Sequence, residues 1–439
     1  MKSSKRKICQ AVALVISALA ASAAMAQTAP ALLGGGSSLV APTIGSEISV
    51  FPSTDGTARY FSVGSGKGQT AFLKNDNTQF GTGLTGAVDF ANSDAPLLAS
   101  QVSAYTTTGG LGVTNGPLIQ IPYIVTPITI PLVNAPTGTG PAFTGSTTPT
   151  VALNDDDLCG IFSGKIANWS NVRNPDATAT NGISSFYPAG AITVVYRADA
   201  SGTSDLLTAH LHQVCNTTNT ASTVSFTETQ SFASLFPSST PPSNFVSATG
   251  SGGVAAALVG FKTTTTAAIG YLSPDFTNTF LAPSSTPAQT NNLSVASLAN
   301  SHLTGTGNAN DVLPTFGNAT TAVGTVAAPG TKLLAKVPTN WVPNASNPTA
   351  GYPVSGTSQI IVSQCYANAG SNSPTPALAV VDFLNLHYAS HAAILHGNGF
   401  DTVPSSFVTA INNDFLSNGS AFNLDIGNTT VCSGTVTGR

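Results

Sequence analysis

The sequence RADASGT, residues 197–203, joins a predicted strand to a predicted helix. The preceding residues 191–196 (AITVVY) are β-branched and aromatic, which is typical of a buried strand. Residues 205–214 (DLLTAHLHQV) have apolar side chains at helical spacing. Residues 191–214 are therefore predicted to form a strand, a polar turn and the start of a helix, in that order.

The side chains of this turn are those expected of an anion site. Ser201 and Thr203 carry hydroxyls that can cap the helix, and Gly202 lets the backbone approach a ligand closely, where free amides of the first turn attract anions. Arg197 adds a planar guanidinium group whose N–H donors suit tetrahedral oxyanions. Asp199, two residues on, could hold that guanidinium in one orientation. A capped helix beside a surface arginine is the alternative interpretation of this stretch alone.

Three more polar turns follow predicted strands, and they contain Ser38, Ser65 and Asp94. In α/β lobes, ligands bind beyond the carboxyl ends of strands, so four such turns from distant parts of the sequence predict one shared site. The glycines after Ser65 do not form a nucleotide-binding P-loop. That motif requires Gly at position 61 and Ser or Thr at position 68, whereas the chain has Phe61 and Gly68.

The fold class follows from the alternation of predicted strands and helices. Such alternation predicts α/β lobes with mainly parallel sheets flanked by helices. Prolines within 118–133 confine that strand-like run to a sheet edge or to a crossing between lobes. Residues 135–150 are expected to form an exposed loop, and residues 277–348 to be irregular with one surface helix. The other predicted elements are strands at 60–63, 88–91, 267–272 and 352–363, and helices at 43–50, 155–162, 254–259, 377–393 and 405–415.

Residues 1–26 have the pattern of a secretory signal, with a basic start, an apolar run and small residues before a cleavage site after Ala26. Cys9 precedes the apolar run, so it does not predict a lipoprotein anchor. Removal of this segment takes away 4 of the 14 Lys and Arg residues and none of the 18 Asp and Glu residues, leaving 10 against 18 and a net charge of −8. This acidic balance argues against nucleic acid as a partner. No other run reaches the roughly 20 apolar residues of a membrane span, so the mature chain is expected to be soluble and periplasmic or secreted.

Four cysteines remain after the signal, an even number in an exported chain, and disulfides are therefore expected. Of three possible connectivities we favour Cys159 with Cys215 and Cys365 with Cys432, because each closes the shorter loop. A zinc site built from cysteines is disfavoured because no close pair such as C-x-x-C is present.

Several blocks of sequence resemble one known family, in order and over nearly all of the mature chain. They are 34–39 (GGGSSL), 63–68 (VGSGKG), 93–94 (SD), 158–170 (LCGIFSGKIANWS), 195–203 (VYRADASGT), 363–368 (SQCYAN) and 426–428 (IGN). These blocks resemble the DING proteins, secreted relatives of the high-affinity phosphate-binding proteins that serve ABC transporters.

The resemblance implies a two-lobed periplasmic-binding-protein fold of type II with phosphate clamped between the lobes. Residues 27–125 and 353–439 would form one lobe and residues 126–352 the other, with irregular insertions at 135–150 and 277–348. The implied partners are phosphate and a phosphate ABC transporter permease, and the implied state is a monomer with no cofactor or metal. Both favoured disulfides agree with the family pattern. The implied phosphate ligands are Ser38, Leu39 through its amide, Ser65, Asp94, Arg197, Ser201, Gly202 and Thr203.

The chain departs from the family pattern at three places. Ala31-Leu32-Leu33-Gly34 replaces the usual Asp-Ile-Asn-Gly start, a serine stands at 38 where the family has threonine, and the loop 135–150 is longer. None of the three departures removes a hydrogen-bond donor that the family uses to bind phosphate.

Two other function classes are kept as alternatives. A secreted phosphatase would need an activated nucleophile or a metal, and the sequence has neither G-x-S-x-G nor H-E-x-x-H. His387, His391 and His396 approach metal spacing, as do His210 and His212, but we interpret them as core or surface residues because no carboxylate stands alongside. A surface or adhesion protein is the second alternative, favoured by many Thr and Ser residues and few charges.

Overall fold

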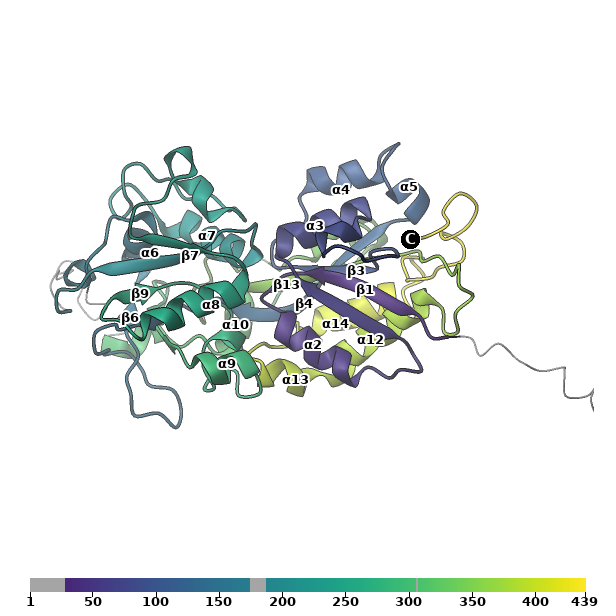
Figure 1. Cartoon of the computed structure of the whole chain (residues 1–439). Coiled ribbons are helices and arrows are strands. Elements are labelled where there is room, and N and C mark those ends of the chain that lie inside the picture. Colours follow the sequence, from purple (N-terminus) through teal and green to yellow (C-terminus); the bar gives the residue numbers. More distant parts are fainter. Residues whose placement is uncertain (1–27, 174–186, 305–306, 344) are drawn as a thin grey trace, which may run out of the picture.

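The computed structural model describes residues 28–173, 187–304, 307–343 and 345–439. The expected signal segment lies outside the described residues. The chain forms two α/β lobes that lie side by side, each with a sheet flanked by helices (Figure 1). The predicted two-lobed fold is therefore confirmed.

The first lobe contains a five-stranded sheet that draws its strands from both ends of the chain. Leu32 and Leu33 alternate across β1, so that Leu32 belongs to the hydrophobic cluster that includes Ile44 and Phe383, and Leu33 belongs to a separate cluster that includes Phe72. In sheet order the strands are β2 (Thr57–Ser62), β1 (Ala31–Gly36), β3 (Phe90–Ser93), β13 (Ser355–Ser363) and β4 (Leu118–Pro127).

Helices cover both faces of this sheet (Figure 1). One face carries α3 (Ser65–Lys74), α4 (Ala99–Thr106) and α5 (Gly112–Asn115). The other face carries α2 (Ala41–Val50), α12 (Pro376–Ser390), α13 (Ala392–Gly397) and α14 (Ser405–Ile411).

The second lobe repeats this plan around another five-stranded sheet. Val194 and Val195 of β7 point to opposite faces of this sheet, because Val194 belongs to the same hydrophobic cluster as Leu207 of α7 and Val195 to the same cluster as Leu258 of α8. Its helices include α6 (Asp155–Ser163), α7 (Gly202–Val214) and α8 (Gly250–Phe261). In sheet order the strands are β10 (Ser294–Val295), β5 (Pro131–Val133), β9 (Ala267–Ile269), β7 (Ile192–Arg197) and β8 (Phe245–Ala248).

The prediction of mainly parallel sheets is confirmed, because four of the five strands in each sheet run in one direction and only β13 in the first sheet and β5 in the second run against them. In the first sheet, β1 is parallel to β2 and β3, but β13 is antiparallel to β3 and β4. In the second, β7 is parallel to β8 and β9, but β5 is antiparallel to β9 and β10. The antiparallel part arises because the chain leaves the first lobe through β4 and re-enters it through β13, so neighbouring strands run in opposite directions.

The two segments that connect the lobes, one after β4 and one before β13, are hydrogen-bonded to each other. The Ile128 amide donates to the Val354 carbonyl at 2.8 Å, just beyond the paired ends of β4 and β13. Strand β4 also ends the first sheet, as its prolines predicted. The covalent connections and a strand pair thus hold the lobes together at one side.

The segment 277–348 is more ordered than predicted. It contains α9 (Thr286–Asn291), α10 (Phe316–Val323) and α11 (Lys332–Ala335). It also supplies β10 and two strands of a small third sheet, in which β11 (Ser297–Ala299) lies between β12 (Asp311–Val312) and β6 (Ala152–Leu153). Strands of two or three residues give too short an alternating pattern to be recognised from sequence.

Both predicted disulfides are present. Cys159 on α6 pairs with Cys215 at the end of α7, and Cys365 pairs with Cys432, with Cα separations of 5.5 and 5.4 Å. Among the described residues, none of the helices is long and apolar enough to cross a membrane.

Candidate anion-binding site

Arg197 lies at the carboxyl end of β7 and is held in one orientation by Asp199. Its Nε donates to Oδ1 of Asp199 at 2.8 Å and its Nη2 to Oδ2 at 2.5 Å, a two-point pair. The Arg197 side chain is 2% exposed and that of Asp199 12%. The prediction that Asp199 holds the guanidinium is confirmed. Because Asp199 occupies only Nε and Nη2, Nη1 remains directed toward Thr203 and Ser251, each with a hydroxyl at 3.4 Å.

Asp94 directly follows β3 in the first lobe and is fully buried. Its Oδ1 accepts hydrogen bonds from the hydroxyls of Ser37 at 2.6 Å and Ser358 at 2.8 Å. Its Oδ2 faces Thr203 of the second lobe, whose hydroxyl lies at 3.5 Å. Burial raises the pKa of this carboxyl, although the hydrogen bonds from Ser37 and Ser358 and the charge of Arg197 act in the opposite direction.

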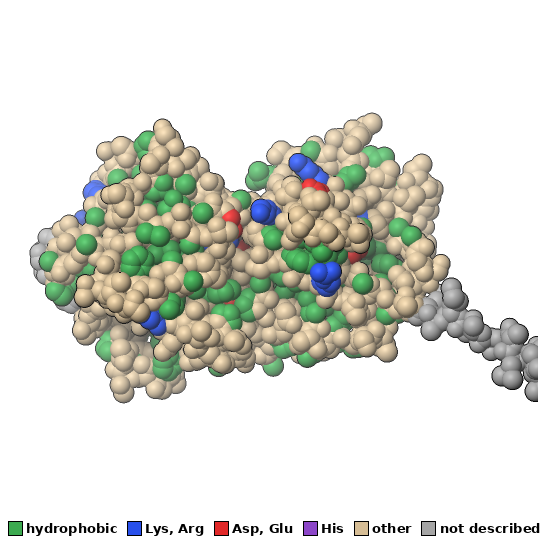
Figure 2. Space-filling view, in the orientation of Figure 1, with side chains coloured by type: hydrophobic (Ala, Val, Ile, Leu, Met, Phe, Trp, Pro, Cys, Tyr) green, Lys and Arg blue, Asp and Glu red, His purple; other side chains and the backbone are tan. Residues whose placement is uncertain are grey.

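The two lobes meet at these side chains. Thr203 lies between Arg197 and Asp94, and its hydroxyl is within 3.5 Å of both. Ser38 of the first lobe contacts Ser251 of the second, with hydroxyl oxygens 2.9 Å apart, and accepts from the Ser251 amide at 3.0 Å. On the surface, Figure 2 shows a notch between the lobes with both basic and acidic side chains at its edges. We call Ser37, Ser38, Asp94, Arg197, Thr203, Ser251 and Ser358 the interlobe cluster.

Three helices begin at or beside this cluster, which adds the positive ends of their dipoles. Helix α7 starts at Gly202, α8 at Gly250 and α3 at Ser65. The Gly250 amide donates to Asp199 at 2.9 Å and the Ser65 hydroxyl accepts from the Asp94 amide at 3.2 Å. The arrangement is therefore rich in N–H and O–H donors around one arginine and one buried carboxyl.

Glycine permits the close approach of the lobes at two positions. A Cβ on Gly202 would lie 2.6 Å from the Cβ of Asp94 and from the Ser65 hydroxyl, both in the opposite lobe. Gly64 has a φ of +91°, and a Cβ there would lie 2.5 Å from Oδ2 of Asp199. Any larger residue at either position would push the two halves of the cluster apart.

The eight predicted ligand residues do not all point at the same space. Ser38, Asp94, Arg197 and Thr203 are brought together in the interlobe cluster. Gly202 and Ser65 line it. Ser201 caps α7 by accepting from the Ser204 amide at 3.3 Å, and the Leu39 amide donates to the Ser37 hydroxyl at 3.1 Å.

Sequence reasoning missed three serines of the cluster. Ser37 neighbours the predicted Ser38, and Ser251 follows β8 at the start of α8, so both had the strand-turn-helix signal of the other turns. Strand β8 was not predicted, and Ser251 was overlooked with it. Ser358 lies in the middle of β13, where no local pattern distinguishes it from other strand residues.

A cavity of about 230 Å³ adjoins the cluster and is lined by three acidic residues, Asp94, Asp205 and Glu228. Asp205 lies in the first turn of α7. Burial, followed by the nearby Glu228 and Asp94 carboxyls, raises the pKa of Asp205 to about 8. Asp205 is therefore expected to be protonated in the folded protein at neutral pH, which limits negative charge beside the cluster.

Replacement Asp205→Asn is expected to make stability less dependent on pH. A carboxyl whose folded pKa is raised contributes stability below its unfolded pKa, near 4, and loses it as the pH rises toward 8. The variant should therefore gain stability relative to the parent between pH 4 and 8, on the order of a few kcal/mol. Denaturant unfolding of both proteins across this range measures the difference. Asp55→Asn, in an exposed turn, is the control, and a pH-independent difference for Asp205→Asn would contradict the assignment.

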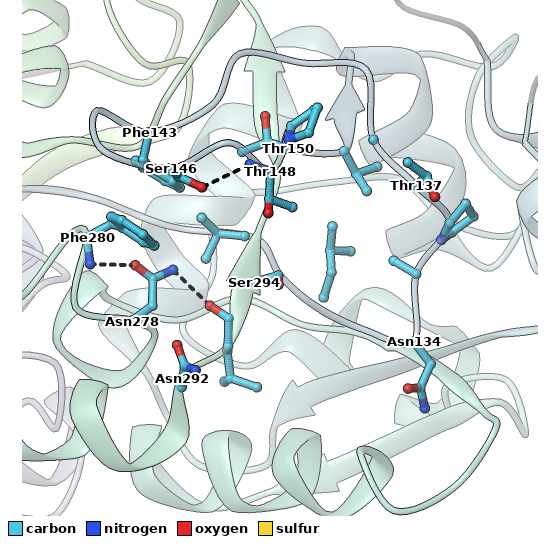
Figure 3. Close-up of a pocket in the computed structure, with 18 residues that line it drawn as sticks. Asn134, Thr137, Phe143, Ser146, Thr148, Thr150, Asn278, Phe280, Asn292 and Ser294 are labelled. Carbon is cyan, nitrogen blue, oxygen red and sulfur yellow. Dashed lines mark hydrogen bonds between the residues drawn. The ribbon is translucent and has the colours of Figure 1, made fainter.

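A larger cavity of about 440 Å³ lies in the second lobe, between the 135–150 loop and residues 278–295 (Figure 3). Phe143 and Phe280 stack there with ring centroids 5.7 Å apart. Two of its polar side chains bond within the fold, since Asn278 donates to the Leu293 carbonyl and accepts from the Phe280 amide, and Ser146 accepts from the Thr148 amide. The residues that line this cavity include no charged side chain, so the interlobe cluster with its buried arginine is the better anion site.

A metal site at the histidines is disfavoured by the sequence, in which no carboxylate stands beside them, but the structure shows that this reason is wrong for His387 and His391. Glu47 of α2 lies between His387 and His391, although it is far away in sequence. Both histidines are buried, as the core interpretation requires, whereas His396 is 42% exposed and bonds to Asp401. His210 is buried against Asp155.

A two-lobed α/β protein with polar helix starts converging between its lobes has the architecture of a periplasmic-type binding protein. A family model described as the PBP superfamily domain matches residues 21–384. The chain belongs to this superfamily, and within it to the group of the DING proteins, as its sequence blocks implied.

Three relatives illustrate the similarity. A protein named phosphate-binding protein, from an unknown prokaryotic organism, is 35% identical over 87% of this chain and 93% of its own length. Alkaline phosphatase L of Pseudomonas aeruginosa is 33% identical over 96% of this chain and 97% of its own. The high affinity periplasmic phosphate-binding protein PfluDING, solved bound with phosphate, has a TM-score of 0.69 and 32% identity, covering 93% of this chain and 99% of that one.

Proposed function

We propose that the chain is an exported phosphate-binding protein that holds one phosphate ion between its two lobes for uptake. The observation that carries this proposal is the buried contact series from Arg197 through Thr203 to Asp94, which joins a guanidinium of one lobe to a carboxyl of the other. Relatives named for phosphate binding, at 35% and 32% identity, support the same ligand.

The chemistry of the cluster suits phosphate. Phosphate near neutral pH retains at least one proton, so it needs one acceptor among many donors. Asp94 would accept that proton in a hydrogen bond, while Arg197 and the hydroxyls would donate to the other oxygens. The proposed ligands are Ser38, Leu39 through its amide, Ser65, Asp94, Arg197, Ser201, Gly202 and Thr203, joined by Ser251.

The remaining assignments rest on this function. We assign residues 27–125 and 353–439 to one lobe and 126–352 to the other. The signal segment 1–26 would be cleaved after Ala26 and would direct the chain to the periplasm or outside the cell. A monomer that delivers phosphate to an ABC transporter permease fits this role.

The phosphate content of the purified protein tests the proposal. Mature protein purified without added phosphate is unfolded in denaturant, and the released phosphate is assayed against the protein concentration. About one phosphate per chain is expected. A chain that carries no phosphate and takes up none on dialysis against phosphate would contradict the proposal.

Phosphatase activity is the second candidate, favoured by the similarity to alkaline phosphatase L. Turnover of p-nitrophenyl phosphate by the parent and by Arg197→Ala, with and without a chelator, decides between the two. Activity that copurifies with the parent and disappears in the variant would establish the enzyme. Equal background turnover in both proteins would leave binding as the function.

A further inference from the structure

Three ionisable side chains that share no residue with the interlobe cluster meet inside the first lobe. Glu47 comes from α2, His387 from α12, and His391 directly follows α12. Their side chains are 0%, 1% and 7% exposed. The possible ligand atoms of all three lie within 4.8 Å of one another.

His387 and His391 both contact the same carboxyl oxygen of Glu47. Nδ1 of His387 lies 2.7 Å from Oε1, and Nδ1 of His391 lies 2.9 Å from it. The other oxygen, Oε2, accepts from the Tyr123 hydroxyl. Two imidazole nitrogens and one phenol hydroxyl thus surround a single buried carboxyl group.

The second ring nitrogen of His387 fixes which tautomer it presents. Nε2 lies 2.7 Å from the Tyr123 carbonyl oxygen, which can only accept, so Nε2 carries a proton. If the His387 ring is neutral, its Nδ1 carries no proton, and the lone pair of Nδ1 points at Oε1 of Glu47. Two lone pairs repel at this distance, so a cation must lie between them, either a second proton or a metal ion.

The surroundings match those of a metal site. Histidines that bind metals usually donate their other N–H to a carbonyl or carboxylate, as His387 does to Tyr123. Ligating carboxylates are themselves hydrogen-bonded, as Glu47 is by the Tyr123 hydroxyl. His387 and His391 are four residues apart on adjoining turns, the spacing of paired zinc histidines.

We propose that Glu47, His387 and His391 bind one divalent transition metal ion, with Zn²⁺ as the best match to two imidazoles and one carboxylate. Tetrahedral ligands at about 2.0–2.1 Å from zinc are roughly 3.3 Å apart, so each nitrogen–oxygen pair would open by about half an ångström. Solvent would supply the fourth ligand from the side of His391, whose side chain is 7% exposed. The ion would fasten α2, which follows the Ser37–Ser38 turn, to α12 near the carboxyl end of the chain.

Zinc binding by the metal-free protein tests this site. Untagged mature protein is stripped with a chelator and titrated with Zn²⁺ against a chromophoric competitor in phosphate-free buffer. About one Zn²⁺ per chain is expected, and Co²⁺ in its place should give the visible absorption of a tetrahedral site. The four mature cysteines form disulfides and do not compete for the metal.

Variants locate the ion. His391→Ala and Glu47→Gln each remove a ligand and should weaken binding by more than the about 10- to 100-fold loss expected of Tyr123→Phe, which removes only a supporting hydrogen bond. His396→Ala, at an exposed histidine bonded to Asp401, is the matched control and should bind like the parent. Circular dichroism confirms folding. If Glu47→Gln does not fold, His391→Ala serves instead, because His391 is the least deeply buried of the three ligands. Absence of tight binding by the parent, or binding unchanged in His391→Ala, would overturn the proposal.

Discussion

Arg197→Ala is expected to abolish tight phosphate binding, with an affinity loss of at least about 100-fold. Each hydrogen bond from a charged donor contributes roughly 1.5–3 kcal/mol, and a factor of ten in affinity corresponds to about 1.4 kcal/mol. The variant also leaves the Asp199 carboxylate beside the site without its partner, since Asp199 bonds to two guanidinium nitrogens. Negative charge there would repel phosphate further. Isothermal titration calorimetry of phosphate-free protein measures the loss.

Loss of fold must be separated from loss of binding in this variant. Removing one partner of a buried ion pair costs about 3–5 kcal/mol of stability. The double variant Arg197→Met with Asp199→Asn removes both charges and should be closer to the parent in stability. We expect it to fold and still not to bind phosphate. Tight binding by a folded protein without this guanidinium would refute the proposed clamp.

Asp94→Asn is expected to narrow the preference for phosphate over sulfate. The Asn oxygen can keep the hydrogen bonds from Ser37 and Ser358 that Oδ1 accepts. The amide NH₂ then replaces Oδ2, so an acceptor becomes a donor where the phosphate hydroxyl would lie. One charged hydrogen bond is worth roughly 1.5–3 kcal/mol, so phosphate affinity should fall by about 10- to 100-fold while sulfate binding increases.

Competition calorimetry with phosphate and sulfate measures this change. Asp55→Asn, in an exposed turn, is the control and should leave selectivity unchanged. In the parent, selectivity should also shrink as the pH falls through the raised pKa of Asp94, because a protonated carboxyl can donate to sulfate. Equal selectivity in Asp94→Asn and the parent would remove Asp94 from this role.

The sequence predicted the parts of the fold whose signals are local. The β-branched run before Arg197 and the helical spacing after it gave β7 and α7, and the polar turns gave four of the residues in the interlobe cluster. The mainly parallel sheets were predicted, but the one reversed strand in each sheet was not, because strand direction there depends on where the chain crosses between lobes. That crossing is decided by the pairing of β4 with β13, more than 200 residues apart in sequence, and no local pattern reports it.

Long-range partners account for the other omissions. Ser358 reaches Asp94 across a sequence separation of 264, and Glu47 reaches His387 across 340. The sequence shows residue types and spacing, so it could place His387 and His391 on one helix but could not place a carboxylate from α2 between them. Tertiary contacts alone convert that histidine pair into a candidate metal site.

A crystal structure of the protein with phosphate tests the central claim most directly. We predict one phosphate ion between the lobes, with Nη1 of Arg197 and Oδ2 of Asp94 both within hydrogen-bonding distance of its oxygens. Phosphate bound to one lobe alone, or at a position that touches neither of these side chains, would contradict the account.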